Sequence, residues 1–358
     1  MTRRDTAPPR RCGRAGASGW VSGFAAIVAV TASSAGCGGG TSTPDATVTE
    51  PQWWRPTYGS VQNWDIQLNP PFDVSSPRTM YVLDLWDLVP LPMTLDYGDG
   101  TPIPVVAGRL AGRVTELHAR TPATVVICRV ETGMLEMDRP DTAKFPDTAI
   151  GDAIPDSPPL AGRPHGKFLD IRATSRAAWA PVMFKRFDLA RQIGCDGILP
   201  MHNDVGSYLK PTAFTITSDD VLSWYTEVAK QGHDRMLSVG LHGGETFPTT
   251  YEQELDSFDW AMIERCGEDM SCDLPAPFKR ADKPVLALEY QTSLPDPDGD
   301  PPTMAVDQTA TVCVRQQQEK NGVTEGLLKD DQLSSAFRMP CEPDDTSGGA
   351  ALRAARRR

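Results

Sequence analysis

The most regular feature of this 358-residue chain is a series of eight short apolar runs, nearly all of which end on or beside a polar residue. The runs cover 64–68, 80–85, 124–130, 197–200, 237–241, 260–263, 285–288 and 323–328. Runs of this length are typical of buried β-strands, and most of the segments between them are long enough to hold a helix. Eight such units predict a single α/β domain with the (β/α)8 fold, a TIM barrel.

The polar residues at the ends of these runs are the first candidates for a functional site. In a (β/α)8 barrel the C-terminal ends of the strands converge on one face, where active sites lie. The candidates on that face are Gln67, Asp84, Asp87, Glu131, His202, Asp204, His242, Glu264, Glu289 and Lys329.

The segments between the runs contain recognisable helices and loops. After Thr217 come an acidic first turn and an apolar stripe at helical spacing, and Gly232 is suited to end this helix. Helices are also predicted over 176–193 and 307–319. Two segments rich in Pro, Gly and Asp, 90–104 and 292–303, are predicted to be inserted loops at the edge of the candidate face.

The first 36 residues have the features of an export signal. Five arginines precede a short apolar stretch, 20–32, which is too short to span a bilayer permanently. Small residues then lead directly into Cys37, a pattern that resembles a bacterial lipobox and predicts cleavage before Cys37 and lipidation of its thiol. The alternative is an ordinary secretory signal with an incidental cysteine.

This reading divides the chain into four parts. Residues 1–36 are the signal, 37–52 a flexible tether, 53–341 the barrel, and 342–358 a disordered tail. The expected location is therefore the bacterial cell envelope, on its periplasmic or outer side, with the lipid as the membrane anchor. Without lipidation the protein is expected to be secreted.

The charge of the chain narrows the choice of partners. The formal net charge is −12, and residues 1–36 carry five arginines and one aspartate, so the mature chain is near −16. Such acidity argues against nucleic acid or an anionic membrane surface as a partner. Neutral and cationic ligands remain, and the protein is expected to be a monomer.

Six cysteines remain after the signal and Cys37, an even number that predicts disulfides in an exported protein. Cys266 and Cys272 bracket a short loop and form the first predicted pair. Cys313 and Cys341, which flank the last helix and strand, form the second. For Cys128 and Cys195, buried free thiols and a bridge remain equally open. No cofactor or metal is predicted, because a site built from His202, His242 and Asp204 satisfies the geometry only loosely.

Several segments, in order, resemble glycoside hydrolase family 114, the endo-α-1,4-polygalactosaminidase family, over residues 53–341. They are WDIQL at 64–68, YVLDLWD at 81–87, LDIR at 169–172, GCDG at 194–197, FDWAMIERC at 258–266, KPV at 283–285, EY at 289–290 and LKD at 328–330. The resemblance implies a TIM barrel, in agreement with the strand count. It also implies hydrolysis of a polysaccharide of α-1,4-linked galactosamine and N-acetylgalactosamine, a partly cationic polymer that an acidic domain suits.

Glycoside hydrolysis generally needs two carboxyl groups, one to protonate the leaving oxygen and one to attack or to activate water. The resemblance implies a Glu at the end of the sixth strand and an Asp at the end of the fourth. Glu264 supplies the first, and it is expected to be the proton donor, with apolar neighbours that raise its pKa. The alternative is a structural carboxylate paired with an arginine.

The fourth strand departs from the family pattern. Where the family reads Glu-Pro-Asp-Asn-x-Asp, residues 199–204 read Leu-Pro-Met-His-Asn-Asp, so Met201 replaces the first Asp. Asp204 is the candidate second carboxylate, with Asp84 as another, and Met201→Asp is expected to raise or create activity. Arg129 replaces a family Tyr, and His242 replaces the Lys of a Lys-Asn pair, so the changes gather at strand ends.

The remaining site predictions concern substrate binding, and they leave the function open between enzyme and binding protein. The candidates are Asp84, Asp87, Trp64, Arg129, His202, His242, Glu289 and Tyr290. Trp64 has packing in the core as its alternative. The first hypothesis is an exported hydrolase; the second is a carbohydrate-binding barrel that has lost its second carboxylate; the third is a structural surface lipoprotein.

Overall fold

The computed structural model describes residues 53–153, 166–203, 213–244, 249–291, 313, 322–323 and 325–341. All of them lie in one compact unit, Thr49–Arg358. The predicted signal, the lipidated Cys37, the tether and the C-terminal tail fall outside the described residues. So do Asp204 and the loop 292–303.

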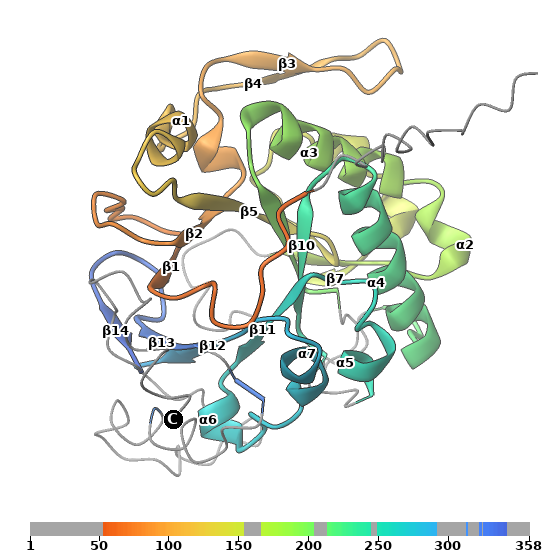
Figure 1. Ribbon diagram of the computed structural model, residues 1–358. Coiled ribbons are helices and arrows are strands. Elements are labelled where there is room, and N and C mark those ends of the chain that lie inside the picture. The colour runs from red at the N-terminus through yellow and green to blue at the C-terminus, as the bar shows by residue number, and fades with distance from the viewer. Residues whose placement is uncertain are drawn as a thin grey trace, which may run out of the picture. The chain divides into compact units, whose positions relative to one another are not determined.

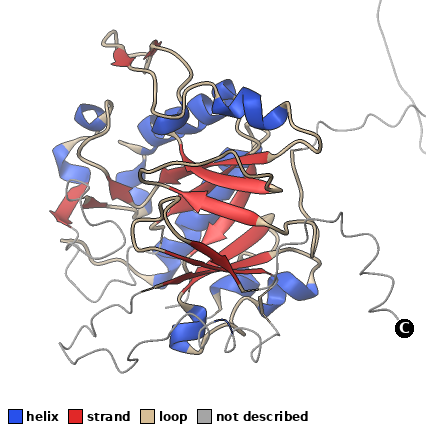
Figure 2. Ribbon diagram, turned by 90° about the vertical axis from the view of Figure 1, so that its left-hand side faces the viewer, coloured by secondary structure: helices blue, strands red, loops and turns tan. Residues whose placement is uncertain are grey.

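Eight parallel strands form the centre of this unit, and all eight were predicted, with ends that differ by no more than two residues. In hydrogen-bonding order they are β1 (Trp64–Gln67), β2 (Met80–Asp84), β5 (Val125–Glu131), β9 (Gly197–Met201), β10 (Ser238–His242), β11 (Trp260–Glu264), β12 (Val285–Tyr290) and β13 (Glu325–Lys329). A ninth strand, β14 (Arg338–Pro340), is antiparallel to β13 and was not predicted. Helices lie along much of the outer side of this sheet (Figure 2).

The two ends of the strand order, β1 and β14, are joined by individual contacts. The amide of Leu68 donates to the Leu333 carbonyl over 2.8 Å, and Arg338 Nη2 donates to the Trp64 carbonyl over 2.8 Å. Lys329 Nζ pairs with Asp65 Oδ1 at 2.9 Å, and burial lowers the pKa of Lys329 although Asp65 opposes the shift. The result is a mostly parallel, nearly closed, barrel-like sheet.

The apolar residues of the strands divide into two cores. Alternate residues such as Trp64, Met80 and Leu286 pack together in one cluster inside the sheet, while a larger cluster lies between the sheet and the helices. Glycine is required at position 240, because a β-carbon there would lie 2.5 Å from the Trp260 ring. Trp64 is therefore a core residue, which was the alternative to its predicted role in substrate binding.

The two longest helices, α3 (Ala180–Ile193) and α4 (Ser218–His233), pack against β9 and β10 (Figure 1). The Thr217 side chain caps α4 by accepting from the Asp220 amide, and Asp220 accepts in return from the Thr217 amide. The helix predicted over 176–193 begins later, at Ala180, where Pro181 opens α3, and Arg176 belongs to the separate short helix α2 (Ala173–Arg176).

The other helices are short. They are α1 (Arg113–His118), α5 (Thr250–Gln253), α6 (Cys266–Asp269) and α7 (Ala276–Arg280), with single 3-10 turns at Trp86–Leu88, Thr142–Lys144 and Asp147–Ala149. The helix predicted over 307–319 is described only at Cys313. Among the described helices, none combines the length and the apolar character that a membrane span needs.

The segment 90–104, predicted to be an inserted loop, forms an antiparallel hairpin of β3 (Met93–Leu95) and β4 (Ile103–Val105) beyond β2. It extends away from the barrel at the top of Figure 1. A second small sheet contains β6 (Met134–Leu135), β7 (Ile150–Ala153) and β8 (Lys167–Leu169), in the connection between β5 and β9.

Three disulfides are present among the described cysteines. Both predicted pairs, Cys266–Cys272 and Cys313–Cys341, are confirmed. Cys128 and Cys195, which were left open, are bonded to each other with their Cα atoms 5.9 Å apart. This bridge ties β5 to the residue two positions before its neighbour β9.

Candidate active site

Glu264, the last residue of β11, is the centre of one polar group at the C-terminal end of the barrel. His242 Nε2, from the end of β10, lies 2.8 Å from Glu264 Oε1, and the Tyr290 hydroxyl, from the end of β12, donates to Oε2 over 2.9 Å. The Tyr225 hydroxyl donates to the His242 carbonyl and holds the end of β10. The Glu264 side chain keeps 25% of its surface exposed. Three neighbouring strands therefore hold one accessible carboxylate.

The surroundings of Glu264 set its protonation state. Burial alone raises its pKa, but the hydrogen bonds and charge from His242, the Tyr290 hydroxyl and the charge of Arg265 outweigh burial and hold the pKa below the usual value for Glu. The prediction that apolar neighbours raise this pKa is therefore wrong. The apolar residues lie along β11 itself, whereas the carboxylate meets polar side chains from β10 and β12. Glu264 is ionised in neutral solution.

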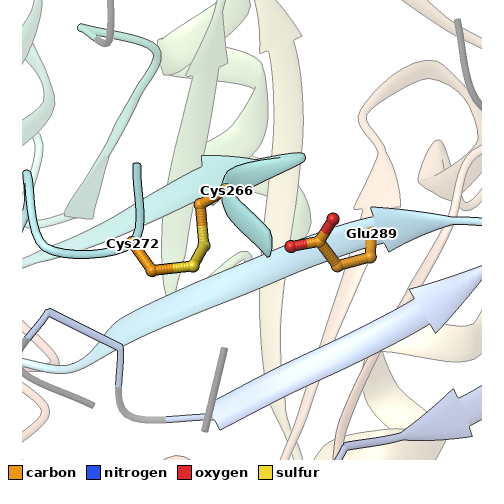
Figure 3. A group of neighbouring side chains, drawn as sticks. All are labelled: Cys266, Cys272 and Glu289. Atoms are coloured by element: carbon orange, nitrogen blue, oxygen red, sulfur yellow. A yellow bond between two sulfur atoms is a disulfide. The ribbon is translucent and has the colours of Figure 1, made fainter. Parts of the chain in front are cut away.

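The turn after β11 supports this group. Arg265 has a left-handed backbone, with φ of 55°, and its guanidinium lies 4.4 Å from the centre of the Tyr290 ring. The Cys266–Cys272 disulfide then closes the turn beside Glu289 (Figure 3). The Gly267 amide donates to Glu289 Oε1 over 2.7 Å. Since the two sulfurs are bonded to each other, they offer no thiolate to a metal, and Glu289 is a buried acceptor for this turn.

A second polar group lies at the ends of β2 and β5 and in the loop after β6, and it consists of buried charges. Arg129 Nη1 donates to Asp84 over 3.1 Å and to Glu136 over 2.7 Å, and Nη2 pairs with Glu131. Arg139 Nη2 also contacts Asp84 at 2.7 Å and Glu136 at 2.6 Å. Burial alone lowers the pKa of Arg139, but these two carboxylates hold it well above its usual value. We call these five residues the buried charge cluster.

The end of β9 lies against this cluster. Met201, at the position where a catalytic Asp was expected, is 4% exposed, and its sulfur lies 3.4 Å from Arg129 Nε. The next residue, His202, has a φ of 56°, and its Nδ1 lies 2.5 Å from Glu131 Oε2. Its side chain is 17% exposed. The expected carboxylate is thus replaced by a thioether sulfur that accepts a weak hydrogen bond from Arg129, followed by a histidine held by Glu131.

The structure brings most of the predicted site residues together, but in two groups. Glu264, His242 and Tyr290 form the first group, and Asp84, Arg129 and His202 belong to the second. Asp87 is buried nearby and is paired with Arg109 at 2.7 Å; burial raises the pKa of Asp87 despite this arginine. Trp64 lies in the barrel interior and Glu289 below the disulfide turn. Asp204 lies outside the described residues.

Glu136 and Arg139 are the members of the cluster that the sequence analysis missed. They lie in the loop after β6, not at the end of an apolar run, so a search of strand ends passes over them. The signal in the sequence is their spacing of three residues shortly after Glu131, at which opposite charges face each other in a turn.

This chain is similar to one protein family and to solved structures of glycoside hydrolases. Residues 43–344 match the sequence profile of glycoside hydrolase family GH114. Ega3 from Aspergillus fumigatus, solved in complex with galactosamine, superposes with a TM-score of 0.59 and 24% identity over 81% of this chain and 98% of its own. The glycoside hydrolase domain of PelA from Pseudomonas aeruginosa gives a TM-score of 0.48 and 12% identity over 76% and 96%. A search of curated proteins finds no match.

Proposed function

Since the chain belongs to glycoside hydrolase family GH114, we propose that it hydrolyses a galactosamine-containing polysaccharide at the C-terminal end of its barrel. The observation that carries the proposal is Glu264, an accessible and ionised carboxylate held by His242 and Tyr290. Galactosamine is the ligand of Ega3, whose fold this chain shares, and that supports the choice of substrate.

The lowered pKa of Glu264 bears on its role in the reaction. One group must protonate the leaving oxygen, and a carboxylate must attack the sugar or activate water. An ionised Glu264 suits the second role in neutral solution, whereas the donor role that the sequence predicted needs a protonated carboxyl and thus acidic solution. Asp204 remains the proposed second carboxylate from the sequence.

The charge of the protein supports a cationic substrate. The amino groups of galactosamine are positively charged near neutral pH, and the mature chain is near −16 with an ionised Glu264 at its site. We therefore expect faster cleavage of a partly deacetylated polymer than of a fully N-acetylated one. The proposal includes export of the protein as a monomer, anchored through a lipid on Cys37 or secreted, and no role for nucleic acid.

The experiment measures new reducing ends when the purified mature domain is incubated with α-1,4-linked galactosamine oligomers. Glu264→Gln removes the charge but keeps the shape, and we expect it to reduce turnover by a factor of about 10² or more. Glu252→Gln, at an exposed position on α5, is the matched control and should leave turnover unchanged. A wild-type protein that makes no new ends would contradict hydrolysis.

Binding without hydrolysis is the second candidate, and Met201 favours it. This residue places a thioether, which has no acid–base chemistry, where the family has a carboxylate. The binding hypothesis expects oligomers to be retained without cleavage, with an affinity that falls as salt is added, because screening weakens the attraction between the acidic domain and the cationic chain.

A further inference from the structure

We infer that the turn after β11 positions Glu264, and that Arg265 is the residue through which the turn acts. The turn covers residues 265–272 and is closed by the Cys266–Cys272 disulfide. This inference rests on the proposed hydrolysis and adds to it the part of the protein that keeps the catalytic carboxylate in place.

The backbone of this turn is fixed at both ends. Arg265 and Met270, on either side of α6, have left-handed backbones, with φ of 55° and 54°. A residue with a side chain disfavours this conformation, so it persists only where the surrounding structure imposes it. The Arg265 amide donates to the Leu288 carbonyl of β12 over 2.8 Å, and the buried disulfide closes the other end. The turn therefore sets the direction in which the Arg265 side chain leaves β11.

The turn also holds the end of β12 on both of its faces. Successive side chains of a strand point to opposite faces, so Glu289 and Tyr290 point away from each other. Glu289 lies beside the disulfide (Figure 3), and its Oε1 accepts from the Gly267 amide over 2.7 Å. On the other face, the Arg265 guanidinium lies 4.4 Å from the centre of the Tyr290 ring. One turn thus holds the strand that carries a hydrogen-bond donor to Glu264.

Tyr290 links Arg265 to Glu264. The Tyr290 hydroxyl donates to Glu264 Oε2 over 2.9 Å, so the position of the ring decides the position of the donor. A guanidinium over an aromatic face attracts the ring, most strongly where both are shielded from water, and Arg265 and Tyr290 are both buried. Arg265 Nη1 also pairs with Glu268 Oε2 at 2.7 Å, and this pair restrains the guanidinium. Since Arg265 acts through another side chain, it is a positioning residue.

The charge of Arg265 also favours the ionised form of Glu264. Burial raises the pKa of Glu264, but the contacts of His242 and Tyr290 and the charge of Arg265 together lower it. The other titratable groups described around this site are Glu289 below the turn, Lys329 beside Tyr290 in register and paired with Asp65, Glu268 and Asp269, whose charges act on Arg265, and Asp331, whose charge acts on Tyr290. Arg265 is the cation that the turn itself supplies.

The first test is Arg265→Met, which keeps a long side chain and removes the guanidinium. With the Tyr290 hydroxyl less well held, we expect kcat on galactosamine oligomers to fall by about 2–30-fold at an unchanged KM, the range that the loss of a cation–π contact converts to. The acidic limb of the pH–rate profile should move up by about 0.5–1.5 pH units, because ionised Glu264 loses support. Arg265→Lys, which keeps the charge without the planar group, should recover part of the limb shift.

The second test is a double-mutant cycle between Arg265 and the disulfide. Replacing Cys266 and Cys272 together by alanine frees the turn, and we expect kcat and the acidic limb to change in the same direction as in Arg265→Met. In the protein with all three substitutions the loss of the disulfide should add little, because the turn acts through Arg265. A disulfide that only stabilises the fold would lower the melting temperature and leave kcat and the limb unchanged.

Two controls match these variants. Replacing Cys128 and Cys195 together by alanine removes another disulfide, and it should lower the melting temperature without moving the limb. Arg280→Met removes an exposed arginine at the end of α7, before β12 begins, and it should change neither kcat nor the limb. The Arg265 variants keep both cysteines of the turn, so they test the inference even if the alanine variant of the turn does not fold.

An NMR titration of carbon-labelled glutamate follows the same shift without turnover, with the Glu264 carboxyl signal identified by its absence in Glu264→Gln. An Arg265→Met protein with the kcat and the limb of the wild type, or shifts that add in full in the cycle, would overturn the role of the turn while hydrolysis stands. A wild-type protein that cleaves no oligomer would overturn hydrolysis. The hold of the turn on Glu264 would then stand if Arg265→Met raises the titration midpoint of Glu264, and it would fall if the midpoint does not move.

Discussion

Replacing Met201 by aspartate restores the carboxylate that the family resemblance leads one to expect, and on sequence grounds this change should raise activity. The structure predicts otherwise. Met201 is buried, with its sulfur 3.4 Å from Arg129 Nε, and Arg129 already contacts Asp84, Glu131 and Glu136. The new carboxyl would enter a cluster that already holds three buried carboxylates. We expect Met201→Asp to lower stability and to give no gain in turnover at pH 7.

The size of the effect follows from Coulomb's law. At about 4 Å and an effective dielectric constant of about 20, attraction to Arg129 contributes about 4 kcal/mol, and Arg139, farther away, adds about 2. Three carboxylates at about 7 Å each repel by about 2.4 kcal/mol, so the attraction and the repulsion nearly cancel. The desolvation of an ionised carboxylate, several kcal/mol, is left unopposed. Burying the protonated carboxyl instead destabilises the fold by less, about 1–3 kcal/mol, which is the cost of a buried hydroxyl with an incomplete set of hydrogen bonds.

The pH dependence of this loss has a definite sign. The folded protein raises the pKa of the new carboxyl above its unfolded value of about 3.9. A raised pKa means that the stability deficit is smallest below about pH 4 and grows as the pH rises toward the folded-state value. At pH 7 we expect a deficit of about 2–4 kcal/mol.

The assay is thermal unfolding of wild-type protein and variant at pH 4 and pH 7, together with the reducing-end assay at pH 7. Met201→Asn is the matched control, because it has the same shape and no ionisable group, and its deficit should not change between the two pH values. If Met201→Asp unfolds like the wild type at pH 7 and cleaves oligomers faster, the charge balance assigned to the cluster is wrong.

Three further predictions concern single contacts. Tyr290→Phe removes a donor to Glu264, so the pKa of Glu264 should rise, and the acidic limb of the pH–rate profile should move up by about 1–2 pH units, since a hydrogen bond to a charged group contributes about 1.5–3 kcal/mol. Replacing Cys128 and Cys195 by alanine together should lower the unfolding free energy in denaturant by about 2–5 kcal/mol, because the bridge closes a long loop with a separation of 67 residues. Lys329→Met leaves the buried charge of Asp65 without its closest cation, so calorimetry should show a loss of about 3–5 kcal/mol, and Lys329→Arg, which keeps the charge, should lose less.

The sequence predicts the strands well because the core dictates them. A strand that is buried on both faces must be a short apolar run, and the eight runs lie between segments that hold helices or turns. The capped helix α4 was found for a similar reason, since Thr217 and Asp220 form a local pattern. The strand β14 was missed because Arg338, Met339 and Pro340 contain no such run, and it pairs with β13 through its backbone.

The chemistry of the site could not be predicted from neighbours along the chain. The residues before Glu264 are apolar, but in a parallel sheet the side chains that meet at a strand end come from the adjacent strands. His242 and Tyr290 are far from Glu264 in sequence and adjacent to it in space, and they reverse the direction of its pKa shift. The bridge between Cys128 and Cys195 depends in the same way on the register of β5 against β9.

The substitutions around the fourth strand depend on one another. A buried arginine at position 129 needs carboxylates, and Asp84, Glu131 and Glu136 supply them, while the Met201 sulfur accepts from its Nε. Simple decay of a site leaves buried charges without partners, at a cost of several kcal/mol for each. Here each charge of the cluster has a partner, and Glu131 also contacts His202 Nδ1. This pairing indicates a rearranged strand end rather than simple decay of the site.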